Sequence, residues 1–248
     1  MLKAEQGGSA TAPISPHQPT CRICNDEGGY IVKSEDGERW RICSDCQDRN
    51  KAARIMKQSK ITEEFKSKLF KNFMQEGMSD QVYNAWKSAG TYAKKFAEIR
   101  SNRQNGMALL GIPGSGKTHL CMAVCNHLIR NGEGLIYFPW VEGFNELKAN
   151  LNELEERVGL LQRIPILYID DMWKGRKEPT DFQIEQTFAI INYRYMNNLP
   201  IIISSEFDID AMCAFDMAIG SRIYEMCRDF CVVIEGGREL NYRLREEA

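Results

Sequence analysis

The chain has 248 residues, of which 43% are hydrophobic and 27% are charged, and its net charge is −2. This composition is typical of a globular protein, and the length suits one large domain with a small one. The nearly balanced charge excludes a globally basic nucleic-acid-binding protein, and no apolar run approaches the roughly 20 residues that a membrane span requires.

Residues 1–20 form a polar segment that contains Gly, Ser and Pro and lacks the apolar core of a signal peptide. We interpret this segment as a disordered tail and expect the protein to lie in a reducing cytoplasm. The odd number of nine cysteines agrees with that compartment. Five cysteines lie in apolar surroundings, and we expect them to be small core residues. They are Cys121, Cys125, Cys213, Cys227 and Cys231.

Two close cysteine pairs follow the tail, with the C-x₂-C, long gap, C-x₂-C spacing of a four-thiolate zinc site. Strands predicted at 28–33 and 39–42, joined by a turn at 34–37, form a hairpin between the pairs. The pattern predicts a zinc ribbon, which depends on its metal for folding and implies no catalysis. A redox role is the alternative, but the βαβ pattern of thioredoxin-like motifs is missing here. The predicted zinc ligands are Cys21, Cys24, Cys43 and Cys46.

Residues 47–71 carry eight basic and three acidic side chains. Such a stretch could bind a phosphate backbone, but more often it is a solvated helix face. We assign residues 21–58 to the zinc-ribbon module with its basic linker helix and residues 59–248 to the larger domain. Ser59 or Thr62 could cap the first helix of that domain. Three phenylalanines follow that could pack on the core or stack on an adenine, with packing the safer interpretation: Phe65, Phe70 and Phe73.

A glycine-rich loop at 111–118 matches the phosphate-binding P-loop, G-x-x-x-x-G-K-[ST]. It lies between an apolar strand at 107–110 and a helix predicted over 118–130, which is the context that the motif requires. Glycines let backbone N–H groups approach a phosphate, and the positive end of the helix adds its partial charge. We expect Lys117 to reach the β- and γ-phosphates and the Thr118 hydroxyl to bind Mg²⁺. The alternative, a chance glycine-rich turn, is disfavoured by this context. The predicted nucleotide-binding residues are Gly111, Ile112, Pro113, Gly114, Ser115, Gly116, Lys117, Thr118 and His119.

Helices and apolar strands alternate through the larger domain. Helical periodicity covers 79–103, 140–161 and 182–198, with a further helix-like segment at 219–226. Strands are expected at 135–138, 164–171, 199–205 and 230–234. Continuous apolar strands are typical of a buried parallel sheet, so the fold class is α/β, a P-loop NTPase with helices flanking the sheet.

Polar residues gather where these strands end, which is where ligands bind in such sheets. Asp170 fits the Walker B role of holding the Mg²⁺ shell, and Asp171 could orient or deprotonate the attacking water. Mere strand capping is the alternative for these two acids. Ser205 and Glu206 are candidates for a sensor that distinguishes triphosphate from diphosphate. Two late arginines, Arg222 and Arg243, have the planar fork that suits phosphate oxygens.

The motifs at 59–65, 111–119, 166–171, 199–206, 220–223 and 241–244 occur in an order that resembles one family. It is the AAA+ ATPases of the bacterial replicative-helicase loaders, the DnaC/DnaI type, which includes the IstB-type transposition ATPases. The resemblance covers about 59–245. It implies that Arg222 is an arginine finger acting on a neighbouring subunit and that Arg243 is a sensor-2 arginine acting in cis. The chain departs from the family at two positions. It has Glu206 where the family often has Asn, which leaves the sensor open between Ser205 and Glu206. It has Asp171 where many related ATPases have Glu, and this side chain is one methylene shorter, which bears on the rate of hydrolysis.

By this resemblance, ATP- and Mg²⁺-bound subunits form an open ring or spiral. They engage a hexameric DnaB-type helicase through the N-terminal module and help to place it on single-stranded DNA. The zinc ribbon and short C-terminus look more like a phage-encoded loader than a chromosomal one. Two alternatives stay open: an IstB-like regulator that remodels DNA for a transposase, and a zinc-ribbon DNA-binding adaptor whose nucleotide site has negligible turnover.

Overall fold

The chain divides into two compact units, residues 1–47 and 48–248. The computed structural model describes residues 23–24, 29–34, 37–43, 63–73, 77–175 and 177–244. The predicted disordered tail, the predicted basic linker helix and the two candidate caps, Ser59 and Thr62, lie outside these ranges.

The small unit contains an antiparallel hairpin of β1 (Gly29–Ser34) and β2 (Gly37–Ile42). This confirms the predicted hairpin. Cys24 and Cys43 are both buried and cluster together, with Tyr30 packed against them. Cys21 and Cys46 lie outside the described residues, and within the described ranges no group of three or more His, Cys, Asp or Glu side chains is arranged to hold a metal ion. The four-thiolate zinc site therefore stays a prediction.

The large unit is built on a five-stranded parallel sheet with the order β4-β5-β6-β3-β7. The predicted α/β fold with a parallel sheet is thereby confirmed. The strands are β3 (Met107–Gly111), β4 (Leu135–Pro139), β5 (Ile166–Met172), β6 (Ile201–Ser205) and β7 (Cys231–Ile234).

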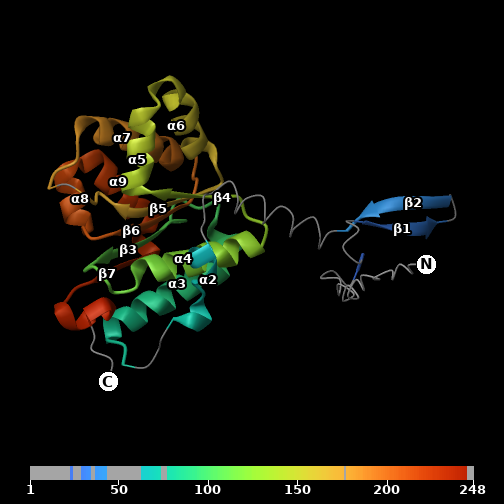
Figure 1. Ribbon diagram of the computed structural model, residues 1–248, viewed down its shortest axis with the longest axis horizontal. Coiled ribbons are helices and arrows are strands. Elements are labelled where there is room, and N and C mark those ends of the chain that lie inside the picture. Colours follow the sequence, from blue (N-terminus) through green and yellow to red (C-terminus); the bar gives the residue numbers. More distant parts are fainter. Residues whose placement is uncertain are drawn as a thin grey trace, which may run out of the picture. The chain divides into compact units, whose positions relative to one another are not determined.

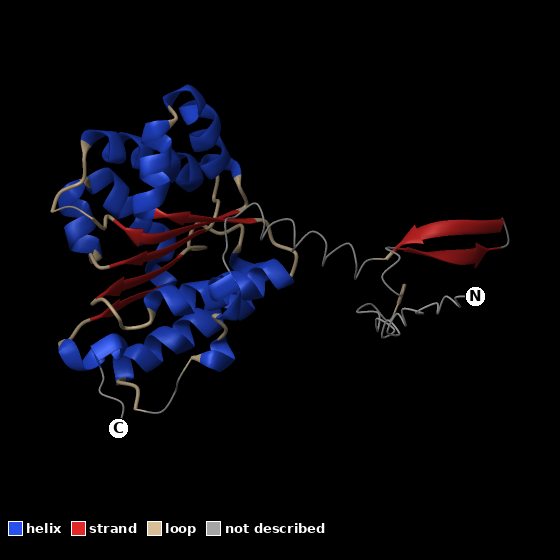
Figure 2. Cartoon of the chain, in the orientation of Figure 1, coloured by secondary structure: helices blue, strands red, loops and turns tan. Residues whose placement is uncertain are grey.

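Helices cover both faces of this sheet (Figures 1 and 2). One face carries α2 (Glu63–Ser67), α3 (Asp80–Ile99) and α4 (Lys117–Arg130). The other face carries α5 (Trp140–Ala149), α6 (Leu154–Arg163), α7 (Asp181–Met196), α8 (Ile209–Phe215) and α9 (Met217–Cys227). Short 3₁₀ turns are η1 (Phe70–Asn72), η2 (Leu151–Glu153), η3 (Arg228–Phe230), η4 (Arg238–Leu240) and η5 (Tyr242–Leu244).

The two faces of the sheet hold two separate hydrophobic cores. Met107 and Leu109 of β3 belong to the core with α3 and α4, whereas Ala108 and Leu110 belong to the core with α5 to α9. This alternation follows from the period of two along a strand, and it explains why the strands are apolar on both faces. Among the described helices, none is both long and apolar enough to cross a membrane.

Side-chain caps fix where the long helices begin. The Ser79 hydroxyl accepts a hydrogen bond from the Val82 N–H at the start of α3, and Thr180 with Gln183 forms a capping box at the start of α7. The predicted helices at 79–103 and 182–198 are confirmed as α3 and α7, each of which ends a few residues before its predicted end.

The predicted continuous helix over 140–161 is wrong. The chain leaves helical geometry at Asn150, with φ −125° and ψ 60°, and resumes as η2 and then α6. The Asn150 side-chain amide donates to the Glu146 carbonyl at 3.0 Å, which satisfies an acceptor at the end of α5 and stabilises the break. Leu151 lies four residues after Leu147, so a continuous helix would place it on the same apolar face; after the break it is 61% exposed.

The five scattered cysteines divide into two groups. Cys121, Cys125 and Cys227 are buried, as predicted, and burial raises the pKa of each thiol well above its usual value. Cys213 and Cys231 are only partly buried. The expectation of core cysteines therefore holds for the first three.

Arg194 of α7 is completely buried. Its guanidinium donates to five backbone carbonyl oxygens, which lie at the end of α6 and just before β5 and β6. Burial lowers its pKa to about 9, so the group is still charged at neutral pH. The acceptors belong to Leu161, Gln162, Ile164, Pro165 and Pro200.

Candidate nucleotide-binding site

The loop between β3 and α4 depends on glycines for its shape. Gly111 and Gly114 have φ values of 106° and 75°, in the left-handed region that disfavours other residues. A Cβ on Gly111 would lie 2.1 Å from the Ile234 carbonyl oxygen, and one on Gly114 would lie 1.9 Å from Asn241 Oδ1. These glycines therefore also allow β7 and the C-terminal segment to pack against the loop.

A cavity of about 520 Å³ opens at the N-terminus of α4. Residues 113–119 line it, together with Asp170, Asp171 and Glu206 from the ends of β5 and β6. Nearly all of the predicted P-loop residues therefore face one cavity. Gly111 and Ile112 are not among the lining residues; their carbonyl oxygens accept hydrogen bonds from the Lys117 ammonium.

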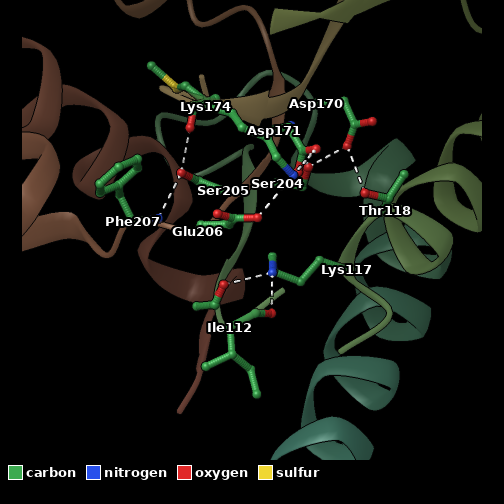
Figure 3. Close-up of polar contacts among 12 residues, drawn as sticks. Ile112, Lys117, Thr118, Asp170, Asp171, Lys174, Ser204, Ser205, Glu206 and Phe207 are labelled. Carbon is green, nitrogen blue, oxygen red and sulfur yellow. Dashed lines mark hydrogen bonds and ion pairs between the residues drawn. The ribbon is translucent and has the colours of Figure 1, made fainter. Parts of the chain in front are cut away.

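Lys117 is buried at this cavity and points along the loop (Figure 3). Its Nζ donates to the Gly111 carbonyl at 2.7 Å and to the Ile112 carbonyl at 2.6 Å. Burial lowers its pKa, while the charges of Asp171 and Glu206 oppose that shift. A phosphate would offer charged acceptors, which bind an ammonium more strongly than these neutral carbonyls.

The Asp170 carboxylate is buried and accepts four hydrogen bonds from hydroxyl groups. Thr118 donates at 3.0 Å and Tyr137 at 3.1 Å, and Tyr168 and Ser204 complete the set. Burial, followed by the negative charge of Asp170, raises the pKa of both tyrosines, so their hydroxyls stay protonated and donate. The Thr118 hydroxyl beside a carboxylate is the hard-oxygen set that suits Mg²⁺.

Asp171 lies at an irregularity in β5, where the pairing with β6 shifts register between Ile169 and Met172. Its N–H donates to Ser204 Oγ at 2.9 Å, and its carboxylate lies 3.0 Å from Lys174 Nζ. The same ammonium lies 3.0 Å from a Glu206 carboxylate oxygen. Burial lowers the pKa of Lys174, but its hydrogen bonds to the two carboxylates outweigh this and raise it. One lysine therefore bridges the acids at the ends of neighbouring strands.

The two sensor candidates occupy different places. Glu206 lines the cavity, whereas the Ser205 hydroxyl is buried, donates to the Met172 carbonyl at 2.7 Å and accepts from the Phe207 N–H at 3.1 Å (Figure 3). The placement favours Glu206 as the residue that meets a ligand.

The two arginines near the end of the sequence, Arg222 and Arg243, lie in different surroundings. Arg243 in η5 lines the cavity, and the preceding Tyr242 N–H holds this segment to the Gly114 carbonyl at 3.0 Å. Arg222 lies within α9, donates to the Ala218 carbonyl at 2.8 Å and is absent from the described residues that line the cavity. Within one chain, the structure brings together every predicted catalytic group except Arg222 and Ser205.

An aromatic wall formed by residues 65–73 closes another side of the cavity. Phe65 and Phe73 line the cavity and also pack against the hydrophobic core. Packing on the core and stacking on an adenine, the two roles considered for these side chains, are therefore compatible. Phe73 meets the His119 ring edge-on at 5.1 Å, and His119 Nε2 lies 3.0 Å from the Leu69 carbonyl. Burial lowers the pKa of His119, which favours its neutral form at pH 7. His119 thus anchors the wall to the P-loop helix.

Sequence reasoning missed Tyr137, Tyr168, Ser204 and Lys174. A signal existed for Tyr168, because a period of two along β5 puts it on the same face as Asp170, and a buried tyrosine hydroxyl needs a partner. Ser204 and Tyr137 reach Asp170 from other strands, so their role depended on strand order. Nothing in the sequence indicated the position of Lys174.

Comparisons with known proteins agree with this architecture. The sequence model of the IstB-like ATP binding protein family matches residues 46–246. The uncharacterized protein YqaM of Bacillus subtilis (strain 168) is 47% identical, covering 87% of this chain and 72% of its own length. The phage-like element PBSX protein XkdC of the same strain is 42% identical, covering 90% of this chain and 86% of its own. A crystal structure of the DnaC helicase loader superposes with a TM-score of 0.57 at 22% identity, over 70% of this chain and all of that one, which shows a shared fold.

Proposed function

The chain belongs to the IstB-like ATP binding protein family, and on that premise we propose that it is an ATP-dependent loader of a hexameric DnaB-type replicative helicase onto single-stranded DNA in the bacterial cytoplasm. The observation that carries the proposal is a nucleotide cavity with P-loop, Asp170 and Asp171 in place but with Arg222 outside it. On our proposal, Arg222 of a second subunit would complete this site. The fold shared with the DnaC helicase loader and the likeness to a phage-element protein support a loader of phage type.

ATP would bind with its phosphates at the N-terminus of α4. Backbone N–H groups of the loop and the Lys117 ammonium would hold the β- and γ-phosphates, and Phe65 and Phe73 would contact the base. Thr118 and Asp170 would hold Mg²⁺, which supplies neutralisation of the phosphate charge. The hydroxyls around Asp170 orient its carboxylate for that role.

Hydrolysis would use groups from two subunits. Asp171 would orient the attacking water, Glu206 would report the terminal phosphate, and Arg243 would contact the phosphates in cis. Arg222 would act on ATP held by the neighbouring subunit, so turnover depends on assembly into an open ring or spiral.

The N-terminal unit would contact the helicase. Its hairpin presents Ile31 and Trp40 opposite each other on adjacent strands, each 58% exposed, which is typical of a contact surface. We assign Cys21, Cys24, Cys43 and Cys46 to a structural Zn²⁺ that would stabilise the unit.

Co-purification tests the proposal against its alternatives. Tagged full-length protein should retain a DnaB-type helicase in the presence of ATP, and Arg222→Ala should keep ATP binding while losing turnover stimulated by single-stranded DNA. Retention of a transposase instead would identify an IstB-like regulator, and ATP binding with no turnover under any condition would identify a DNA-binding adaptor. The same preparation should retain zinc after exhaustive dialysis; reduced protein without zinc would overturn the four-cysteine site alone.

A further inference from the structure

Lys174 links two acids that come from different strands. Its Nζ lies 3.0 Å from Asp171 Oδ2, at the end of β5, and 3.0 Å from Glu206 Oε1, directly after β6. All three side chains line the nucleotide cavity, and their exposed fractions are 41% for Lys174, 36% for Asp171 and 33% for Glu206. Figure 3 shows the three side chains together. The ammonium is therefore accessible to a ligand.

The turn that carries Lys174 is held by buried contacts. Asp171 and Trp173 both have left-handed backbone, with φ values of 52° and 69°, and the Lys174 N–H donates to the Asp171 carbonyl at 3.0 Å. Trp173 is 3% exposed and packs against Trp140 at 4.7 Å and Phe215 at 5.7 Å between ring centroids. Left-handed conformations of this kind persist only where surrounding structure imposes them. The packing of Trp173 thus fixes the backbone at Lys174, and with it the end of the cavity to which the Lys174 side chain belongs.

Three carboxylates lie at this end of the cavity, and their negative charges would repel a phosphate unless a cation balances them. The carboxylates of Asp170, Asp171 and Glu206 all face the space beside Lys117. Asp170 is satisfied by its four hydroxyl donors, but Asp171 and Glu206 would present two negative charges to a terminal phosphate. The charges of Asp171, Glu206 and Lys174 all influence the pKa of Lys117, so these groups lie within electrostatic reach of the ammonium expected to hold phosphate.

We propose that Lys174 is the residue that makes this cavity prefer a nucleoside triphosphate to a diphosphate. Its ammonium cancels one of the two negative charges that Asp171 and Glu206 would direct at the γ-phosphate, and it offers a donor to that phosphate. A diphosphate lacks the γ-phosphate and is correspondingly less affected. The inference rests on the ATP-binding part of the proposed function and is independent of the helicase.

The test compares binding of MgATP and MgADP by calorimetry. Lys174→Met should weaken MgATP binding on the order of tenfold, the effect of one unit charge acting across part of the cavity, and should change MgADP binding less than about twofold. Adding Glu206→Gln to this variant should restore most of the affinity for MgATP, because the uncompensated charge is removed. Lys174→Arg should keep the preference, and Lys95→Met, at an exposed position of α3, should behave as the parent protein.

The outcomes are distinct. Equal weakening of both nucleotides by Lys174→Met, or no recovery in the double variant, would overturn the role of Lys174. If the parent protein itself binds neither nucleotide, the ATP site of the proposed function fails. Thermal unfolding of each variant checks that the fold is intact; should Lys174→Met unfold, Lys174→Gln carries the same expectation.

Discussion

Ser204 and Ser205 are neighbours in β6 whose hydroxyls have different partners. Successive side chains of a strand point to opposite faces, so Ser204 reaches Asp170 and the Asp171 N–H, whereas Ser205 reaches the Met172 carbonyl and the Phe207 N–H. Ser204 therefore belongs to the nucleotide site, whereas Ser205 holds the end of β5 and the residues that follow β6.

This difference predicts separate effects on stability and turnover. Ser204→Ala and Ser205→Ala should each lower the free energy of unfolding by about 1–3 kcal/mol, since each leaves buried polar groups without a partner. Ser204→Ala should also lower MgATP turnover 10–100-fold, on the order expected for partners of a metal-binding carboxylate, while Ser205→Ala keeps turnover within about twofold. Urea unfolding and steady-state hydrolysis measure the two effects; equal losses of turnover would contradict the assignment.

At this scale the sequence predicts residues whose role is local. The P-loop is recognisable because its glycines, Lys117 and Thr118 occur in one short run between a strand and a helix. Ser205 was considered and Ser204 was not, because the choice depends on which of the two side chains lies on the same face of the sheet as the Asp170 carboxylate. Lys174 was missed because left-handed backbone at Asp171 and Trp173 is imposed by packing and not by glycine.

Among the elements, the segment from α5 to α6 shows how periodicity misleads. Leucines continue at helical spacing through residues 147–161, but Asn150 ends α5 and turns Leu151 into solvent. The neighbouring Leu147 is 2% exposed in the core. Two leucines that look equivalent in the sequence therefore differ in what they bury.

We expect Leu147→Ala to lower the free energy of unfolding by about 2–4 kcal/mol, because it removes buried methyl groups and leaves a cavity. Leu151→Ala should change the same quantity by less than about 0.5 kcal/mol. Chemical denaturation of both variants provides the comparison. Similar losses would mean that 140–161 forms the continuous amphipathic helix after all.

The strands could be predicted from the sequence and α8 could not, because the two kinds of element differ in how many of their residues are buried. Strands buried on both faces are continuous apolar runs, which stand out in a sequence. The seven residues of α8 bury only Met212 and begin at the polar Asp208 cap, so no periodic pattern marks them. Short helices of this kind are defined mainly by the surface on which they pack.

For the whole molecule, the position of Arg222 has the largest consequence. Its guanidinium lies near the Phe188 and Tyr195 rings of α7 and not at the chain's own cavity. The resemblance to the helicase-loader ATPases implies that this arginine acts on a neighbouring subunit, which calls for a test with two kinds of subunit.

Mixing two inactive variants tests the shared site. Lys117→Ala should lose ATP binding, and Arg222→Ala should bind ATP without turnover. In an equimolar mixture, an Arg222→Ala subunit holding ATP beside a Lys117→Ala subunit supplies a complete site, so about a quarter of the parent rate should return. Turnover is measured at concentrations that favour assembly. A mixture as inactive as its components would contradict the action of Arg222 on ATP held by a neighbouring subunit.

The buried guanidinium of Arg194 connects α7, through hydrogen bonds, to the end of α6 and to the residues just before β5 and β6. Its five acceptors exist together only when α6, α7 and the residues just before β5 and β6 have all assembled. A partly folded chain that lacked one of these elements would carry a charge in its interior with too few acceptors, at a high cost in free energy. We therefore expect these elements to unfold together, so that the strands that carry Asp170 and Ser204 separate only when the helical layer of α6 and α7 unfolds.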